Sequence, residues 1–207
     1  GSGMHLHLSL FSGDTNAFYS ADDPNNLSPV AKSFMAGLLR HAAEITAVTN
    51  QTVNSYKRLV PGFEAPVHIS WARNNRSGLI RVPIPKRGSV SATRIEYRSP
   101  DPACNPYLAF SVILAAGMKG IREGYVLEPE ADANLFEMDD AALEKLGIRQ
   151  LPQSLNDALK VMETSELVQE ALGEHIFEWF LRNKRHEWRE YKTQVTPFEL
   201  NRYLKSL

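Results

Sequence analysis

Three polar side chains near the amino terminus have the types and the spacing of a ligand set. His5, His7 and Ser9 alternate with three leucines, so on an extended strand they would share one face. Neutral imidazole is a common ligand of divalent metals, and the two histidines could share a metal or divide between a metal and a nucleotide. Histidines exposed near a terminus, or a cloning remnant ahead of Met4, would give the same pattern.

A second alternating pattern occurs in TRIEYRS, residues 93–99. As a strand, this stretch puts Arg94, Glu96 and Arg98 on one face. A carboxylate between two guanidinium groups stays ionised and can ligate a metal while the arginines bind phosphate oxygens. A solvated strand face with weak cross-strand ion pairs would explain the pattern equally well.

The stretch RLVPGFEAP puts Arg58 and Glu64 at the two ends of a Pro-Gly turn. Such a loop could act as a lid that carries a carboxylate over a bound substrate and excludes water, or it could be an ordinary turn with an exposed glutamate. Arg76 and Arg81 could clamp phosphates or simply lie on the surface. The sequence contains no glycine-rich phosphate loop or dinucleotide fingerprint that would decide between these alternatives.

Most of these candidates fall in one basic part of the chain. Between Lys57 and Arg98 there are nine basic residues and two acidic ones, a local charge of +7, whereas all 207 residues together carry −1. Arginine concentrated in this way favours a local anion site for phosphate or carboxylate groups. The overall charge and a pI near 6.7 argue against a general nucleic-acid binder.

Composition narrows the class of protein further. The hydrophobic fraction of 43% and the charged fraction of 23% are ordinary for a globular domain. No apolar run approaches the roughly 20 residues that span a bilayer, and no secretory leader is present, so we expect a soluble protein without a membrane partner. The single Cys104 excludes an internal disulfide, which fits a reducing compartment.

The elements that must position these residues follow from local signals. Ser28-Pro29 and Asn105-Pro106 each supply an N-cap and a first-turn proline. They predict helices over about 29–47, with a break near His41 left open, and from 106 to about 125, the second apolar on most sides and therefore buried. Strands are expected first and helices after them, which predicts an α+β fold. The expected strands are the opening stretch, 65–73, 78–83 and 93–99, the further expected helices begin at Ser154, Glu174 and Pro197, and 14–26 is expected to be a loop.

Four long motifs, taken together, make the chain recognisable. In order they are GSGMHLHLSL, NSYKRLVPGFEAPVHISWARNNRSGLIRVP, TRIEYRSPDPACNPYLAFSVILAAGMKGI and EYKTQVTPFELNRYL. They resemble the carboxy-terminal part of the catalytic domain of bacterial and archaeal type I glutamine synthetase, from the first residue nearly to the last. The resemblance implies that residues 1–207 are the carboxy-terminal portion of this domain, a mostly antiparallel sheet flanked by helices. The amino-terminal domain and the first part of the catalytic domain would be absent.

The resemblance also implies an activity. Members of this family use ATP as co-substrate and Mg²⁺ or Mn²⁺ to phosphorylate the side-chain carboxylate of L-glutamate, and ammonia, drawn from ammonium, then displaces phosphate to give glutamine. The parent protein would be a cytoplasmic homo-oligomer, a dodecamer of two hexameric rings. We expect the 207 residues alone to bind nucleotide weakly and to be inactive, because the family's upstream metal-ligating carboxylates are missing.

Residue by residue, the matched motifs imply specific roles. His5 and Glu96 match metal ligands. Gly1, Arg58 and Arg98 match residues that bind glutamate, and His7, Ser9, Arg81 and Arg94 match the nucleotide site. Arg76 matches the arginine that stabilises the transferred phosphoryl group, and Glu64 matches the lid glutamate that shields the acyl-phosphate and helps take a proton from ammonium. One position departs from the family pattern, because Asn134-Leu135-Phe136 has phenylalanine where adenylylated members have tyrosine.

Two other functions remain open at this stage. A paralogue that joins glutamate to a larger amine, such as a polyamine or ethanolamine, would keep the same ATP and glutamate residues. A non-catalytic assembly module on the same fold is the third alternative. The arginines and Glu64 argue against that module, because a structural protein has no need of buried positive charge.

Overall fold

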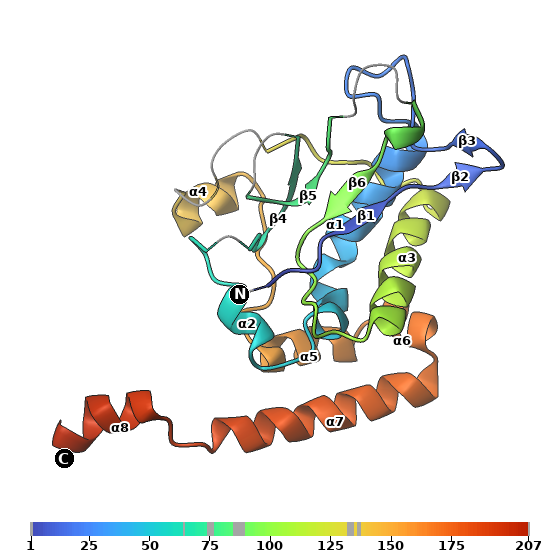
Figure 1. The fold of residues 1–207 in the computed structure, drawn as a ribbon. Helices are drawn as coiled ribbons and strands as arrows, with labels where there is room; N and C mark the ends of the chain where they lie inside the picture. The colour runs from blue at the N-terminus through green and yellow to red at the C-terminus, as the bar shows by residue number, and fades with distance from the viewer. Residues whose placement is uncertain are drawn as a thin grey trace.

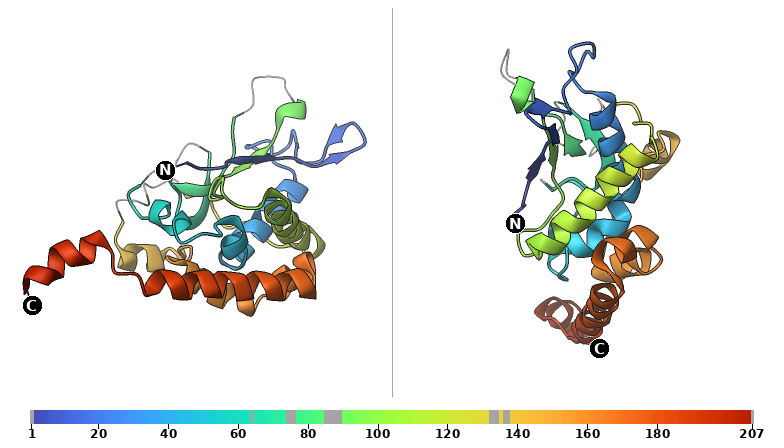
Figure 2. Two further views of the ribbon diagram at one scale, coloured as in Figure 1. Left: turned by 60° about the horizontal axis from the view of Figure 1, so that its bottom comes forward. Right: turned by 90° about the vertical axis from the view of Figure 1, so that its right-hand side faces the viewer.

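The structure, a computed structural model, describes residues 2–63, 65–73, 77–84, 90–131, 135 and 138–206. A four-stranded sheet forms one layer, and helices pack against a single face of it (Figures 1 and 2). In sheet order the strands are β1 (Leu6–Leu8), β6 (Ile95–Tyr97), β5 (Gly78–Arg81) and β4 (His68–Ala72). This arrangement confirms the predicted α+β fold.

The pairing within the sheet is mostly antiparallel, as expected. β1 pairs antiparallel with β6, and β6 pairs antiparallel with β5. β4 and β5 follow each other in the sequence yet pair in parallel, with His68 opposite Gly78 and Ala72 opposite Arg81. A two-stranded hairpin, β2 (Phe11–Ser12) with β3 (Thr15–Asn16), extends into the region that we expected to be a loop.

Two long helices cover the inner face of the sheet. The first is α1 (Pro29–Thr49), which begins where predicted because the Ser28 hydroxyl accepts a hydrogen bond from the Ala31 amide at 3.1 Å. It runs unbroken past His41 and buries Phe34, Leu38 and Ile45 against Ile80, Ile95 and Tyr97 of the sheet layer, within one core cluster.

The second long helix, α3 (Pro106–Arg122), is capped by Asn105 as predicted. Its expected burial on most sides is wrong, because Tyr107, Phe110 and Leu114 lie on an exposed face. The opposite face packs against α1 so closely that a Cβ at Gly37 would lie 2.2 Å from the Ala116 carbonyl oxygen. One apolar face of α3 therefore packs closely against α1, and its other apolar face is exposed to solvent.

The remaining helices are α2 (Ser55–Arg58), α4 (Asp140–Lys145), α5 (Leu155–Glu163), α6 (Glu166–Leu172), α7 (Glu174–Lys192) and α8 (Pro197–Tyr203), with 3-10 turns η1 (Val90–Ala92) and η3 (Leu204–Ser206). Of these helices, α2, α5, α6 and α7 lie below the sheet, α4 lies beside β4, and α8 continues from α7 as an arm (Figure 1). The Ser154 and Thr196 caps begin helices as the sequence indicates. Among the described residues, no helix is both long and apolar enough to cross a membrane.

Candidate functional site

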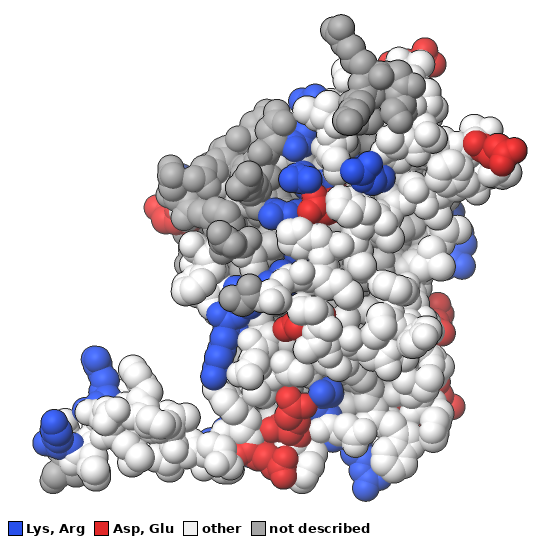
Figure 3. Space-filling model, in the orientation of Figure 1, with Lys and Arg blue, Asp and Glu red and all other residues white. Residues whose placement is uncertain are grey.

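The outer face of the sheet, which none of the described helices covers, carries a row of three polar residues. The register places His7 of β1 opposite Glu96 of β6, and Glu96 opposite Arg81 of β5. Because side chains alternate along a strand, residues paired in this way project from the same face. Figure 3 shows basic side chains gathered around an acidic one over β1, β5 and β6.

Glu96 is the centre of this cluster. Its side chain is buried, with 4% exposed, and its carboxylate contacts three cationic or titratable groups. Oε1 lies 2.8 Å from His5 Nδ1 and 3.8 Å from Arg98 Nε, and Oε2 lies 2.6 Å from Arg81 Nε. Glu96 and Arg98, two members of the predicted Arg–Glu–Arg face, are therefore buried in an ionic cluster, whereas Arg94 is only partly buried and contacts His7.

His5 and His7 share the outer face, as their alternation predicted, but they have different partners. Burial and the charge of Arg98 lower the pKa of the His5 imidazole below its ordinary value, against the opposing effect of Glu96. A neutral imidazole retains a lone pair that can bind a metal. His7 accepts a hydrogen bond at its Nδ1 from Arg94 Nε at 3.2 Å, and Ser9, directly after β1, is exposed.

The two arginines that the resemblance assigns to glutamate lie at the end of β6. Arg58, the last residue of α2, donates from Nη1 to the Ser99 carbonyl at 2.8 Å and from Nη2 to the Arg98 carbonyl at 3.1 Å. Burial lowers the pKa of the Arg58 guanidinium, an effect that Asp101 opposes. Arg98 is buried and donates to the Gly78 carbonyl, so backbone oxygens hold both cations beside the cluster.

Gly3 is a member of the site that the sequence did not single out. A Cβ at this position would lie 2.5 Å from Arg58 Nη2 and 3.3 Å from His5 Nε2. The absence of a side chain thus lets the backbone pass between the guanidinium and the imidazole. Nothing in the nearby sequence distinguishes Gly3 from an ordinary loop glycine, because the need for glycine arises from its contact with Arg58 of α2.

Three expected site residues, Gly1, Glu64 and Arg76, lie outside the described residues, as do Asn134 and Phe136. The chain leading to Arg76 is anchored at Arg73. Its backbone amide donates to Glu130 Oε1 at 2.7 Å, and its Nε donates to Glu130 Oε2 at 2.9 Å. Glu130 was not predicted, since its sequence surroundings give no sign of a partner 57 residues away.

The donor set fits part of a divalent-metal site. His5 supplies an imidazole nitrogen and Glu96 a carboxylate oxygen, and both are ordinary ligands of transition-type divalent ions. Within the described ranges, no group of three or more histidine, cysteine or acidic side chains could hold a metal. Two ligands are too few for tight binding, so further donors would have to come from outside these residues.

Comparison with known proteins identifies the family to which this arrangement belongs. A model of the glutamine synthetase catalytic domain matches residues 1–203. The chain belongs to the glutamine synthetase family. Glutamine synthetase of Mycolicibacterium smegmatis is 60% identical over 204 residues, and that of Thermotoga maritima is 53% identical over 206 residues. The recognition made from the four motifs is confirmed.

Solved structures agree with the sequence relatives of this chain. A structure titled as a GmaS/ADP complex superposes with a TM-score of 0.85 at 38% identity, covering 99% of this chain and 46% of that one. The alignment with each of the two bacterial relatives covers 99% of this chain and 46% of the relative. The chain thus spans about half the length of the curated glutamine synthetases that it matches.

Proposed function

We propose that residues 1–207 form the carboxy-terminal portion of a glutamine synthetase catalytic domain. The reaction joins ammonia to the side-chain carboxylate of L-glutamate through γ-glutamyl phosphate, with ATP converted to ADP and phosphate. The observation that carries this proposal is the buried Glu96 carboxylate in contact with His5, Arg81 and Arg98 on an uncovered sheet face. Such a cluster has the charge and exposure to receive metal and phosphate groups.

In the proposed site, His5 and Glu96 hold a divalent ion, Mg²⁺ or Mn²⁺. A bound divalent ion supplies charge neutralisation and polarisation of phosphoryl oxygens. Arg81 and Arg98 lie within ion-pairing distance of the same carboxylate, at 2.6 Å and 3.8 Å, and so flank the proposed ligand.

The basic residues around Glu96 divide between the two substrates. We assign His7, Ser9, Arg81 and Arg94 to ATP, since they lie on or beside the exposed outer face of β1, β5 and β6. Arg58 and Arg98 would hold the carboxylates of glutamate at the end of β6, and the matched motif assigns Gly1 to the same substrate. Arginine suits this task because its planar donors match a carboxylate in two places.

The remaining catalytic roles fall to Arg76 and Glu64. Phosphoryl transfer spreads negative charge over the equatorial oxygens, and we propose that Arg76 stabilises this charge. An acyl-phosphate hydrolyses readily in water, so Glu64 on its Pro-Gly loop would shield the intermediate and accept the proton that ammonium loses. Both assignments come from the matched motifs.

A chimera tests the proposal directly. This chain would replace the matching 46% of the Mycolicibacterium smegmatis relative, and glutamine formation from glutamate, ATP and ammonium would be measured. We expect activity in the chimera and none in the 207 residues alone. The variant Arg76→Ala should lower kcat by at least about 100-fold, with Arg122→Ala on α3 as the control. Full activity of Arg76→Ala, or glutamine formation by the isolated chain, would contradict these roles.

The same chimera separates ammonia from larger amines. The fold of this chain also matches the GmaS/ADP complex, whereas its higher sequence identity is to proteins named glutamine synthetase. We therefore expect ammonium to be preferred over methylamine, ethanolamine and polyamines at equal concentration. A higher kcat/KM for any of these amines would favour the paralogue instead.

Self-association is the proposed quaternary arrangement of the parent protein. α8 projects from the body beyond α7, which two views show (Figures 1 and 2). It has no buried residue and exposes Phe198, Leu200 and Tyr203. Exposed apolar side chains on a projecting helix are typical of a contact with another chain, and we propose a second copy of this one. The dodecameric assembly and a cytoplasmic location stay predictions.

A further inference from the structure

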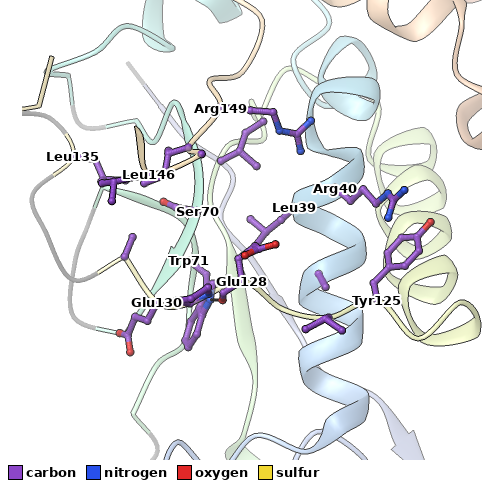
Figure 4. Close-up of a pocket in the computed structure, with 17 residues that line it drawn as sticks. Leu39, Arg40, Ser70, Trp71, Tyr125, Glu128, Glu130, Leu135, Leu146 and Arg149 are labelled. Carbon is purple, nitrogen blue, oxygen red and sulfur yellow. Dashed lines mark hydrogen bonds between the residues drawn. The ribbon is translucent and has the colours of Figure 1, made fainter. Parts of the chain in front are cut away.

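A cavity lies apart from the cluster formed by Glu96 and its three partners. Its volume is about 780 Å³, and it is bounded by α1, by β4 and by the segments 125–131 and 146–149 (Figure 4). Neither Glu96 nor any of its three partners is among the described residues that line it. A volume of this size is in the range of pockets that bind small organic molecules.

The walls of this cavity are mainly apolar. Leu39 of α1, Ile69 and Trp71 of β4, and Leu135 and Ile148 from the two segments line it. The Trp71 indole Nε1 donates to the Glu128 carbonyl at 2.7 Å, and the Ala131 amide donates to the Trp71 carbonyl at 3.0 Å. These bonds tie the 125–131 segment to β4, so the cavity is held by backbone contacts as well as by packing.

Four charged side chains also line the cavity, and two of them are already engaged. Glu130 holds Arg73 through both carboxylate oxygens. The Arg40 guanidinium lies 4.4 Å from the centre of the Tyr125 ring. Neither group is therefore available to a ligand without breaking an existing contact.

The other two charged side chains, Glu128 and Arg149, are exposed at the rim of the cavity and have no such partner. Among the described residues, neither side chain forms a hydrogen bond, an ion pair or a ring contact. Figure 4 shows them entering from two different segments of the chain. The hydroxyl of Ser70, a residue that is 93% buried and lines the same cavity, also has no hydrogen-bond partner.

These features specify the chemistry of a ligand. One free carboxylate and one free guanidinium match a molecule that carries both a positive and a negative charge, whereas a simple anion or cation would leave one of them unpaired. The apolar walls match an uncharged body. We propose that this cavity binds an α-amino acid with an apolar side chain, its carboxylate at Arg149, its ammonium group at Glu128 and its side chain against Trp71 and Leu39.

Binding of leucine to the 207-residue chain, measured by titration calorimetry, is the first test. Two fragments of leucine serve as comparisons: 3-methylbutan-1-amine lacks the carboxylate, and 4-methylpentanoate lacks the ammonium group. Loss of one charge-assisted hydrogen bond should weaken binding about 10-fold, so each fragment should bind at least that much more weakly than leucine.

Paired variants identify the contacts. Glu128→Gln should weaken leucine about 10-fold and leave 4-methylpentanoate unchanged, whereas Arg149→Gln should weaken leucine and leave the amine unchanged. The controls, Glu170→Gln on α6 and Arg122→Gln on α3, change exposed charges outside the cavity and should alter neither affinity. Thermal melting of each variant would verify that it is folded.

A site-specific signal accompanies the calorimetry. The chain has three tryptophans, and only the Trp71 indole N–H, which is bonded to the wall of the cavity, should shift in a nitrogen–proton NMR spectrum when leucine is added. No binding at millimolar leucine, or equal affinity in both variants and wild type, would overturn the proposal. Neither readout requires ligase activity, so failure here is distinct from failure of the proposed enzyme function.

Discussion

At the scale of single residues, Glu96 is the side chain on which the site depends. Its buried carboxylate contacts His5, Arg81 and Arg98, and Arg98 is itself buried. Replacing one member of a buried ionic cluster leaves the opposite charges uncompensated. We expect Glu96→Gln to lower the free energy of unfolding by about 3 kcal/mol in urea denaturation, because the amide cannot balance two guanidinium groups.

The matched control is Glu170→Gln, an exposed glutamate on α6, which should change stability by less than about 0.5 kcal/mol. If both variants were equally stable, the contacts of Glu96 would contribute nothing net. The alternation of residues in TRIEYRS predicted that Arg94, Glu96 and Arg98 share a strand face, so this part of the site could be predicted from the sequence. The burial of Glu96 and Arg98 was not, because it arises from β1 and β5, which pair with this strand from distant parts of the sequence.

At the scale of elements, the α1–α3 contact depends on glycine. A Cβ at Gly37 would meet the Ala116 carbonyl oxygen at 2.2 Å, and one at Gly120 would meet the Ser33 carbonyl oxygen at 2.1 Å. Alanine favours a helix over glycine by about 1 kcal/mol, yet here it would force the two helices apart. We expect Gly37→Ala to lower the free energy of unfolding by about 2 kcal/mol in net.

Gly147→Ala provides the contrast for this prediction. No atom lies within 4 Å of a Cβ built there, but φ is +68°. The substitution should therefore cost only the backbone strain of a left-handed residue, about 1 kcal/mol. A stabilised Gly37→Ala variant would mean that the two helices can separate without loss of packing.

A hydrogen-bonded carboxylate joins α1 to α6 and gives this contact a pH dependence. Glu44 Oε1 lies 2.8 Å from His41 Nδ1, and the Ser165 hydroxyl donates to Oε2. Burial raises the pKa of Glu44, but the hydrogen bonds with His41 and Ser165 lower it by more. The pKa of Glu44 in the folded protein is therefore below its ordinary value. The stabilisation is thus complete above the unfolded-state pKa of about 4.3 and is lost as pH falls through the lower folded-state value.

We expect the stability difference between wild type and Glu44→Gln to be constant at neutral pH and to shrink as pH falls below about 4.3. Urea denaturation between neutral and acidic pH would measure it. Glu178→Gln, at an exposed position on α7, should show no such convergence. A gap that widened in acid would mean that the folded state raises the pKa of Glu44.

Some elements were predictable because their signals are local. Ser28-Pro29, Asn105-Pro106 and Ser154 cap helices that begin where the sequence indicated, since a cap and a first-turn proline act on adjacent residues. The parallel pairing of β4 with β5 and the exposed face of α3 were not predictable. Both depend on which surfaces meet in three dimensions. The apolar residues of a strand or a helix do not specify which other element packs against them.

At the scale of the whole molecule, one group of exposed apolar side chains lies on the arm that projects from the body. The start of α8 is fixed by its own side chains, because Thr196 and Glu199 form a reciprocal capping box. Nevertheless Phe198 and Leu204 are each 65% exposed, which leaves the capped helix and its 3-10 extension without a hydrophobic partner. Helical order without burial favours a contact supplied by another copy of the chain.

The double variant Phe198→Ser with Leu204→Ser tests this contact. We expect it to lower self-association at least about 10-fold, since it removes two large apolar side chains from one short helix and its extension, each worth about 1.5–3 kcal/mol when buried. Sedimentation velocity over a range of concentrations would measure the change. Ile84→Ser, a substitution of an equally exposed apolar residue outside the arm, is the control and should leave association unchanged. An effect of Ile84→Ser equal to that of the arm variant would indicate general surface stickiness, whereas loss of association with the arm variant alone would identify α8 as the contact.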